Sequence, residues 1–130
     1  MKKLTIDLSS AQILYDAVHF TDSIGVDLHY AIEKLLKAFL AFENAKIPKI
    51  HDLPQLYTFV SHKITVSNED ILYIATKYHI EESYPQYDRA LPSRKEITEV
   101  LDFANDLFER VCKILEIDLA RKIVLILYLV

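Results

Sequence analysis

The stretch that decides the fold is residues 28–44, LHYAIEKLLKAFLAFEN. Its apolar residues recur every three or four positions, which places them on one face of an α-helix. That apolar face is broad, because a second row of large side chains lies beside the first; the two rows are Leu28, Ala31, Leu35, Phe39 and Phe42, and Ile32, Leu36 and Leu40. We therefore expect a helix over about 26–44 that contacts several neighbours, a partner subunit among them.

The segment before this helix carries a helix-start signal. A serine followed three residues later by Gln, Glu or Asp resembles a capping box, in which each side chain satisfies a free backbone N–H of the other residue. Ser9 and Gln12 fit this pattern. We expect a helix from Ser9 to about Asp22, ended by Ile24-Gly25, with a buried stripe made of Ile13, Ala17 and Phe20.

Three further helices are expected after the linker AKIPKI (45–50). Their predicted starts are a cap at Asp52 and capping boxes at Ser67–Asp70 and Ser93–Glu96. Their predicted buried stripes are, in order, Leu53, Leu56, Tyr57 and Val60; Ile71, Ile74, Ala75 and Tyr78; and Ile97, Leu101, Ala104, Phe108, Val111 and Leu115. The sequence thus predicts an all-α protein, an up-and-down antiparallel bundle of four or five helices, as a single domain over 1–130.

The tail IVLILYLV (123–130) is eight consecutive apolar residues. Its β-branched side chains would suit a strand, but no second strand is evident to pair with it, so continuation of the last helix is favoured. The run is far shorter than the ~20 residues that a membrane-spanning helix needs. An exposed run of this kind promotes aggregation, so we expect it to be covered across a homodimer.

Composition excludes several classes of protein. With one glycine, the chain has no glycine-rich loop for a dinucleotide or for nucleotide phosphates. The formal charge of −4 gives no overall basic field for nucleic acid. The lone cysteine, Cys112, rules out an intramolecular disulfide and a Cys-rich zinc site, and we expect a buried thiol in a reduced, cytoplasmic protein.

The histidines give only a partial metal-binding pattern. His29 and Glu33 lie four residues apart, so a helix would place both on one face with ligand spacing. Sequence alone brings neither His51 nor His79 to that face. We therefore predict no metal or other cofactor and a helix-surface or capping role for His29 and Glu33. The pair His51-Asp52 stays open between a helix cap, which is favoured, and an acid–base pair.

One stretch concentrates groups suited to recognition, EESYPQYDRALPSR (81–94). Tyrosine rings offer stacking surfaces and arginines make forked contacts with phosphate, while free amides in the first turn of a helix favour anions. The candidate nucleotide- or anion-binding residues are Tyr84, Tyr87, Arg89, Arg94 and Lys95. The competing interpretation is a proline-stiffened loop whose aromatic rings seal the end of the bundle.

Three segments in order suggest a family. LHYAIEKLLKAFLAFENAKIP (28–48), HDLPQLY (51–57) and YHIEESYPQY (78–87) resemble the HEPN family, the higher eukaryote and prokaryote nucleotide-binding domains. The resemblance covers about 8–116 and leaves 117–130 as an apolar extension. It implies a helical bundle, usually dimeric, commonly encoded beside a separate minimal nucleotidyltransferase in toxin–antitoxin-like pairs.

Some HEPN proteins are ribonucleases whose motif is an arginine followed, after four to six residues, by a histidine. In this chain every histidine precedes every arginine, so that motif is absent and no catalytic residue is assigned. Ser83 also departs from the family, where an arginine is frequent. We predict a non-catalytic module that pairs with a nucleotidyltransferase and binds nucleotide or the partner's substrate. The alternatives are a ribonuclease toxin with an unusual site, such as His79, Tyr84 and Arg89, and a purely structural oligomer.

Overall fold

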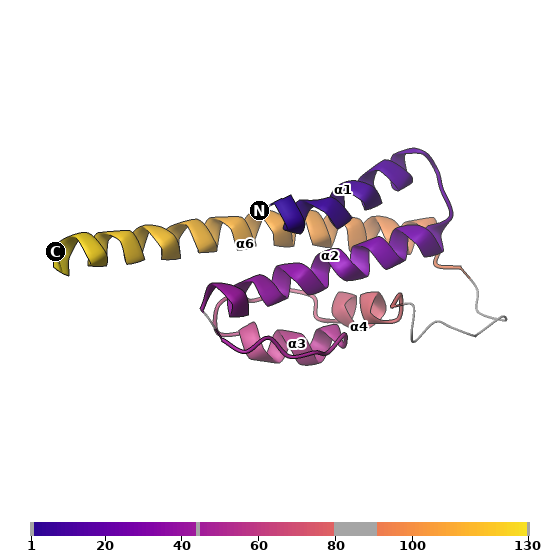
Figure 1. The fold of residues 1–130 in the computed structure, drawn as a ribbon. Coiled ribbons are helices and arrows are strands. Elements are labelled where there is room, and N and C mark those ends of the chain that lie inside the picture. The colour runs from indigo at the N-terminus through magenta and orange to yellow at the C-terminus, as the bar shows by residue number, and fades with distance from the viewer. Residues whose placement is uncertain (1, 44, 80–90, 130) are drawn as a thin grey trace.

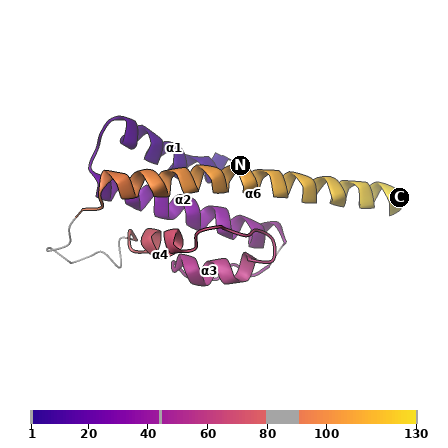
Figure 2. The ribbon, with the colours of Figure 1, turned by 180° about the vertical axis from the view of Figure 1, so that it is seen from behind.

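The computed structural model describes residues 2–43, 45–79 and 91–129. Over these residues the chain forms five helices and no strand, which confirms the all-α bundle. Helices α1, α2 and α6 run alongside one another, and α3 and α4 lie on another side of α2 (Figures 1 and 2). The helices are α1 (Lys2–Asp16), α2 (Thr21–Phe42), α3 (Leu53–Val60), α4 (Asp70–Thr76) and α6 (Arg94–Leu129).

Helix α2 is the centre of the bundle. It packs against α1, α3, α4 and α6, which explains why its apolar face is so broad. The predicted rows are buried except for Phe42, which is partly exposed. Contact with several neighbours is therefore confirmed within one chain, while contact with a partner subunit stays a prediction.

Helix α1 differs from the sequence prediction in both its start and its buried face. It begins at Lys2, so Ser9 lies in mid-helix and caps nothing. The buried residues are Leu8 and Ala11, whereas Ile13 is 67% exposed and Ala17 and Phe20 are also exposed. The prediction of a stripe at Ile13, Ala17 and Phe20 was wrong because apolar residues occur on more than one side of this helix, and packing against α2 selects the side that carries Leu8 and Ala11.

The turn after α1 is made by a valine. Val18 has a φ of 55°, in the left-handed region that favours glycine. Its N–H donates to the carbonyl of Tyr15 at 3.1 Å, and His19 N–H donates to Leu14 O at 2.9 Å. The second of these bonds has the span of a Schellman turn, which satisfies the last carbonyls of α1.

The predicted helix break at Ile24-Gly25 was wrong, because both residues lie inside α2. Gly25 is buried, and a Cβ atom there would lie 2.9 Å from Cγ of Tyr78. The chain's one glycine therefore permits close packing of a tyrosine ring against a helix instead of forming a turn.

Two of the other predicted helix starts are confirmed. The Asp52 side chain accepts a hydrogen bond from Gln55 N at 2.8 Å, and Ser93 Oγ accepts one from Glu96 N at 3.1 Å. The Ser67 start was wrong, since α4 begins at Asp70 and its N–H donates instead to Asn68 Oδ1 at 3.1 Å. The nearer asparagine satisfies that N–H with a local turn.

The predicted stripes of the last three helices are largely confirmed. All four α3 positions are buried, as are Ile71, Ala75 and Tyr78, with Ile74 partly exposed. Along α6 the stripe is buried except for Phe108 and Leu115, which are half-buried against the core. Two further residues of α6, Val100 and Leu107, are also buried, as is Leu72 on α4.

The apolar tail continues α6, as the favoured interpretation predicted. The C-terminal part of this helix projects well beyond the other helices (Figures 1 and 2). Leu127 is 71% exposed and Tyr128 is 85% exposed. Among the described residues, no helix has the length and apolar character to cross a membrane.

Candidate functional site

The structure describes only part of the loop predicted to bind nucleotide. Tyr84, Tyr87 and Arg89 lie outside the described residues. Arg94 lies over the ring of Tyr15, with its guanidinium carbon 3.9 Å from the ring centroid, and donates to Tyr15 O at 3.0 Å. It therefore connects α6 to the end of α1, while Lys95 is exposed. The structure thus describes two of the five predicted residues, and nucleotide binding stays a prediction.

A cavity of about 350 Å³ lies beside the start of α6. It contains charges of both signs, because Lys77 and Glu96 both line it. The Glu96 carboxylate accepts a 2.5 Å hydrogen bond from the Tyr78 hydroxyl. The remaining lining residues are Ile74, Tyr78, Leu91, Pro92 and Ser93.

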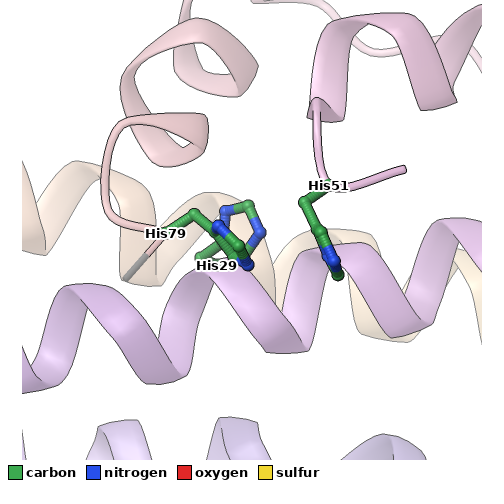
Figure 3. A group of neighbouring side chains, drawn as sticks. All are labelled: His29, His51 and His79. Atoms are coloured by element: carbon green, nitrogen blue, oxygen red, sulfur yellow. The ribbon is translucent and has the colours of Figure 1, made fainter. Parts of the chain in front are cut away.

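A cluster of three histidines forms where α2, α3 and α4 meet. His29 comes from α2, His51 from the segment before α3 and His79 from the segment after α4 (Figure 3). Each histidine has one ring nitrogen that lies within 4.8 Å of a ring nitrogen of both other histidines. The rings of His51 and His79 stack with centroids 4.2 Å apart, and those of His29 and His79 are 4.9 Å apart.

Hydrogen bonds to backbone and side-chain groups of α4 bring these segments together. His29 Nδ1 donates to the carbonyl of Ala75 at 3.0 Å. The Thr76 hydroxyl accepts from Leu53 N at 2.7 Å and donates to His51 O at 3.3 Å. The end of α4 is thereby held against the start of α3, which places His51 beside His79.

Glu33 borders the cluster and is itself buried, at 7% exposure. Its Oε1 accepts a hydrogen bond from His51 Nδ1 at 2.6 Å, and its Oε2 lies 3.3 Å from Lys37 Nζ. Burial alone would raise the pKa of this carboxyl, but the hydrogen bond from His51 and the charge of Lys37 outweigh it and lower the pKa from 4.5 to about 2. Glu33 is therefore a carboxylate at neutral pH.

These positions correct the surface role predicted for His29 and Glu33, since both are buried. The predicted cap at Asp52 is confirmed, and His51 pairs with Glu33 instead of with its sequence neighbour. The i, i+4 spacing of His29 and Glu33 was the one sequence signal for this cluster. Nothing in the sequence pointed to His51 and His79 joining it, because tertiary packing brings them there.

Cys112 is half-buried on α6. Burial raises the pKa of its thiol, and the charge of Glu116 raises it further. The protonated thiol is a poor nucleophile, in keeping with the unreactive role expected for this residue.

Comparison with known proteins identifies the family. The family model for the HEPN domain matches residues 5–115. No curated protein and no solved structure matched the chain. The match includes the central helix α2, both short helices, the histidine cluster and the part of α6 that packs in the bundle. The chain belongs to the HEPN domain family.

Proposed function

We propose that this protein is a non-catalytic HEPN module that forms a homodimer and pairs with a separate minimal nucleotidyltransferase, as in toxin–antitoxin-like systems. The observation that carries the proposal is the projecting part of α6 (Figure 1), where the apolar side chains that the structure describes are exposed. The order of histidines before arginines supports a role without ribonuclease chemistry, because the family's Arg–His motif cannot form.

The lengths of the helices show how much of α6 lacks a neighbour. With 36 residues α6 is roughly 54 Å long, whereas α2 with 22 residues spans roughly 33 Å. The projecting part exposes Val124, Leu127 and Tyr128. Exposed apolar surface on a projecting helix is typical of a protein–protein interface, and a second copy supplies a matching helix without requiring any other gene product.

Light scattering after size-exclusion chromatography tests the dimer. We expect the unaltered chain to have twice the chain mass and the double variant Val124→Glu/Leu127→Glu to be monomeric, since charges in an apolar contact cost several kcal/mol. Tyr73→Glu is the matched control, because Tyr73 is an exposed aromatic residue on α4, away from the tail. A monomeric unaltered chain, or a control that dissociates equally, contradicts dimerisation through α6.

Co-expression tests the partner. A tagged nucleotidyltransferase from the neighbouring gene should retain the untagged chain through purification, and the purified chain should leave RNA intact. Absence of a complex contradicts the pairing but not the dimer. RNA cleavage that is lost in the Arg89→Ala variant would instead support the ribonuclease alternative.

We propose nucleotide binding beside the start of α6 as an accompanying role, with two lysines as the cations that would contact phosphate. Lys77 lines the cavity, and Lys95 is exposed in the first turn of α6 nearby. We expect calorimetric titration with ATP to give saturable binding that weakens in Lys77→Ala and Lys95→Ala. Lys113→Ala, an exposed lysine farther along α6, should leave the affinity unchanged. Equal affinity in all four proteins would contradict binding at this cavity.

A further inference from the structure

We propose that His29, His51 and His79 form a binding site for one divalent transition-metal ion of the zinc class. This site lies apart from the projecting part of α6 and does not depend on the proposed function. Neutral imidazole nitrogens are preferred ligands of zinc, copper and nickel, and three of them from three chain segments are a common ligand set.

The strongest evidence is the orientation of His29. A carbonyl can only accept, so the 3.0 Å bond to Ala75 O requires the proton of the neutral ring to be on Nδ1. This leaves a lone pair on Nε2, the atom of a fully buried side chain that has no hydrogen-bond partner. A ring held by a backbone carbonyl through one nitrogen, with the other nitrogen available, is the usual arrangement of a metal-binding histidine.

His29 Nε2 lies 3.4 Å from Glu33 Oε1, but this contact is not a hydrogen bond. The contact is long and lacks hydrogen-bond geometry, so Nε2 remains unsatisfied. In the neutral ring both atoms are acceptors and repel each other. A metal ion between the rings accepts the Nε2 lone pair and places positive charge near the carboxylate.

The distances between the rings also suit a metal ion. Zinc–nitrogen bonds of about 2.0–2.1 Å in a tetrahedron place ligand nitrogens roughly 3.3 Å apart. The cluster's nitrogens already lie within 4.8 Å of one another, so the widest gap has to close by roughly 1.5 Å. The rings of His51 and His79 are stacked at an interplanar angle of 18°, so at least one of them has to turn out of the stack for both lone pairs to point at one ion.

Glu33 is assigned the role of a positioning residue. Its carboxylate accepts from His51 Nδ1 at 2.6 Å, which leaves the other nitrogen of that ring, Nε2, to bind the ion. The side chain of His51 is 42% exposed, so the cluster reaches solvent on that side. An ion can enter there, and its fourth coordination position can be filled by water.

Calorimetric titration of the untagged, chelator-treated full chain with zinc chloride tests the proposal. We expect one zinc ion per chain and a rise in thermal unfolding temperature on zinc addition, because an ion that binds the folded state stabilises it. His51→Ala should weaken binding at least tenfold, roughly the loss seen when metal ligands are disturbed. The matched control His62→Ala, an exposed histidine outside the cluster, should retain full affinity.

Two further measurements keep the test decisive if His51→Ala folds poorly. In the unaltered chain, zinc should shift the ring-proton NMR signals of three of the five histidines and leave those of His19 and His62 in place. Glu33→Gln should weaken zinc binding about 10- to 100-fold with the one-to-one stoichiometry retained. No saturable binding, an equal loss in His62→Ala, or shifts confined to His19 and His62 would overturn the proposal.

Discussion

Replacing Val18 with glycine should stabilise the protein, because the turn between α1 and α2 holds this valine at a φ of 55°. An L-residue in this region pays about 1–2 kcal/mol, and β-branched residues are especially disfavoured. Glycine removes that strain but costs about 0.5–1 kcal/mol in added freedom of the unfolded chain. Val18 is 72% exposed, so little packing is lost. We expect a net gain in unfolding free energy of about 0.5–1 kcal/mol.

Urea unfolding followed by far-UV circular dichroism measures this gain, with all proteins at one concentration because a dimer's stability depends on it. At a slope of about 2 kcal/mol/M, the midpoint should rise by about 0.25–0.5 M. Val18→Asn should gain less, since asparagine tolerates this conformation better than valine does, and Val18→Ala should gain least. Our reasoning about the turn fails if glycine gives no gain, or if alanine gains as much as glycine.

Three other substitutions test the packing and the cluster. Gly25→Ala should destabilise by about 1 kcal/mol in urea unfolding, since overpacking against the Tyr78 ring outweighs the better helix propensity of alanine; greater stability would contradict this. Tyr57→Phe should cost about 1–3 kcal/mol in the same assay, because the Tyr57 hydroxyl is the acceptor for the buried Val66 N–H; Tyr73→Phe, at an exposed tyrosine, is its control. Glu33→Gln should lower stability at neutral pH by about 2 kcal/mol. Because the folded pKa of Glu33 lies at about 2, below 4.5, the difference from the unaltered chain should be full above pH 4.5 and disappear as pH falls toward 2; a pH-independent difference would refute the charge argument.

The parts of the fold that sequence predicts well are those where one apolar face dominates. α2, α3 and α6 each show a single clear period, so their buried residues follow from spacing. α1 has apolar residues on two sides, Leu8 and Ala11 on one and Ile13 on another, and only docking against α2 decides between them. The end of α1 could not be predicted from the sequence either. The turn is made by Val18, a residue type that does not indicate a turn, whereas Gly25, which does, lies inside α2.

The histidine cluster shows a different limit. Helical spacing pairs His29 with Glu33, since both lie on one element. The approach of His51 and His79 depends on Thr76, which bridges α4 to the backbone around α3. A threonine that makes two such bonds looks the same in sequence as one exposed to solvent. Residue spacing therefore does not predict a site that is assembled by tertiary hydrogen bonds between short helices.

The C-terminal end of α4 lies between the two candidate binding regions. Tyr78 packs on Gly25, lines the cavity and donates to Glu96 at the start of α6. The next residue, His79, stacks on His51 within the histidine cluster. These neighbours are joined by one peptide bond, and the Tyr78 ring lies where a side chain at position 25 would otherwise stand. The end of this segment therefore joins the wall of the cavity directly to the histidine cluster.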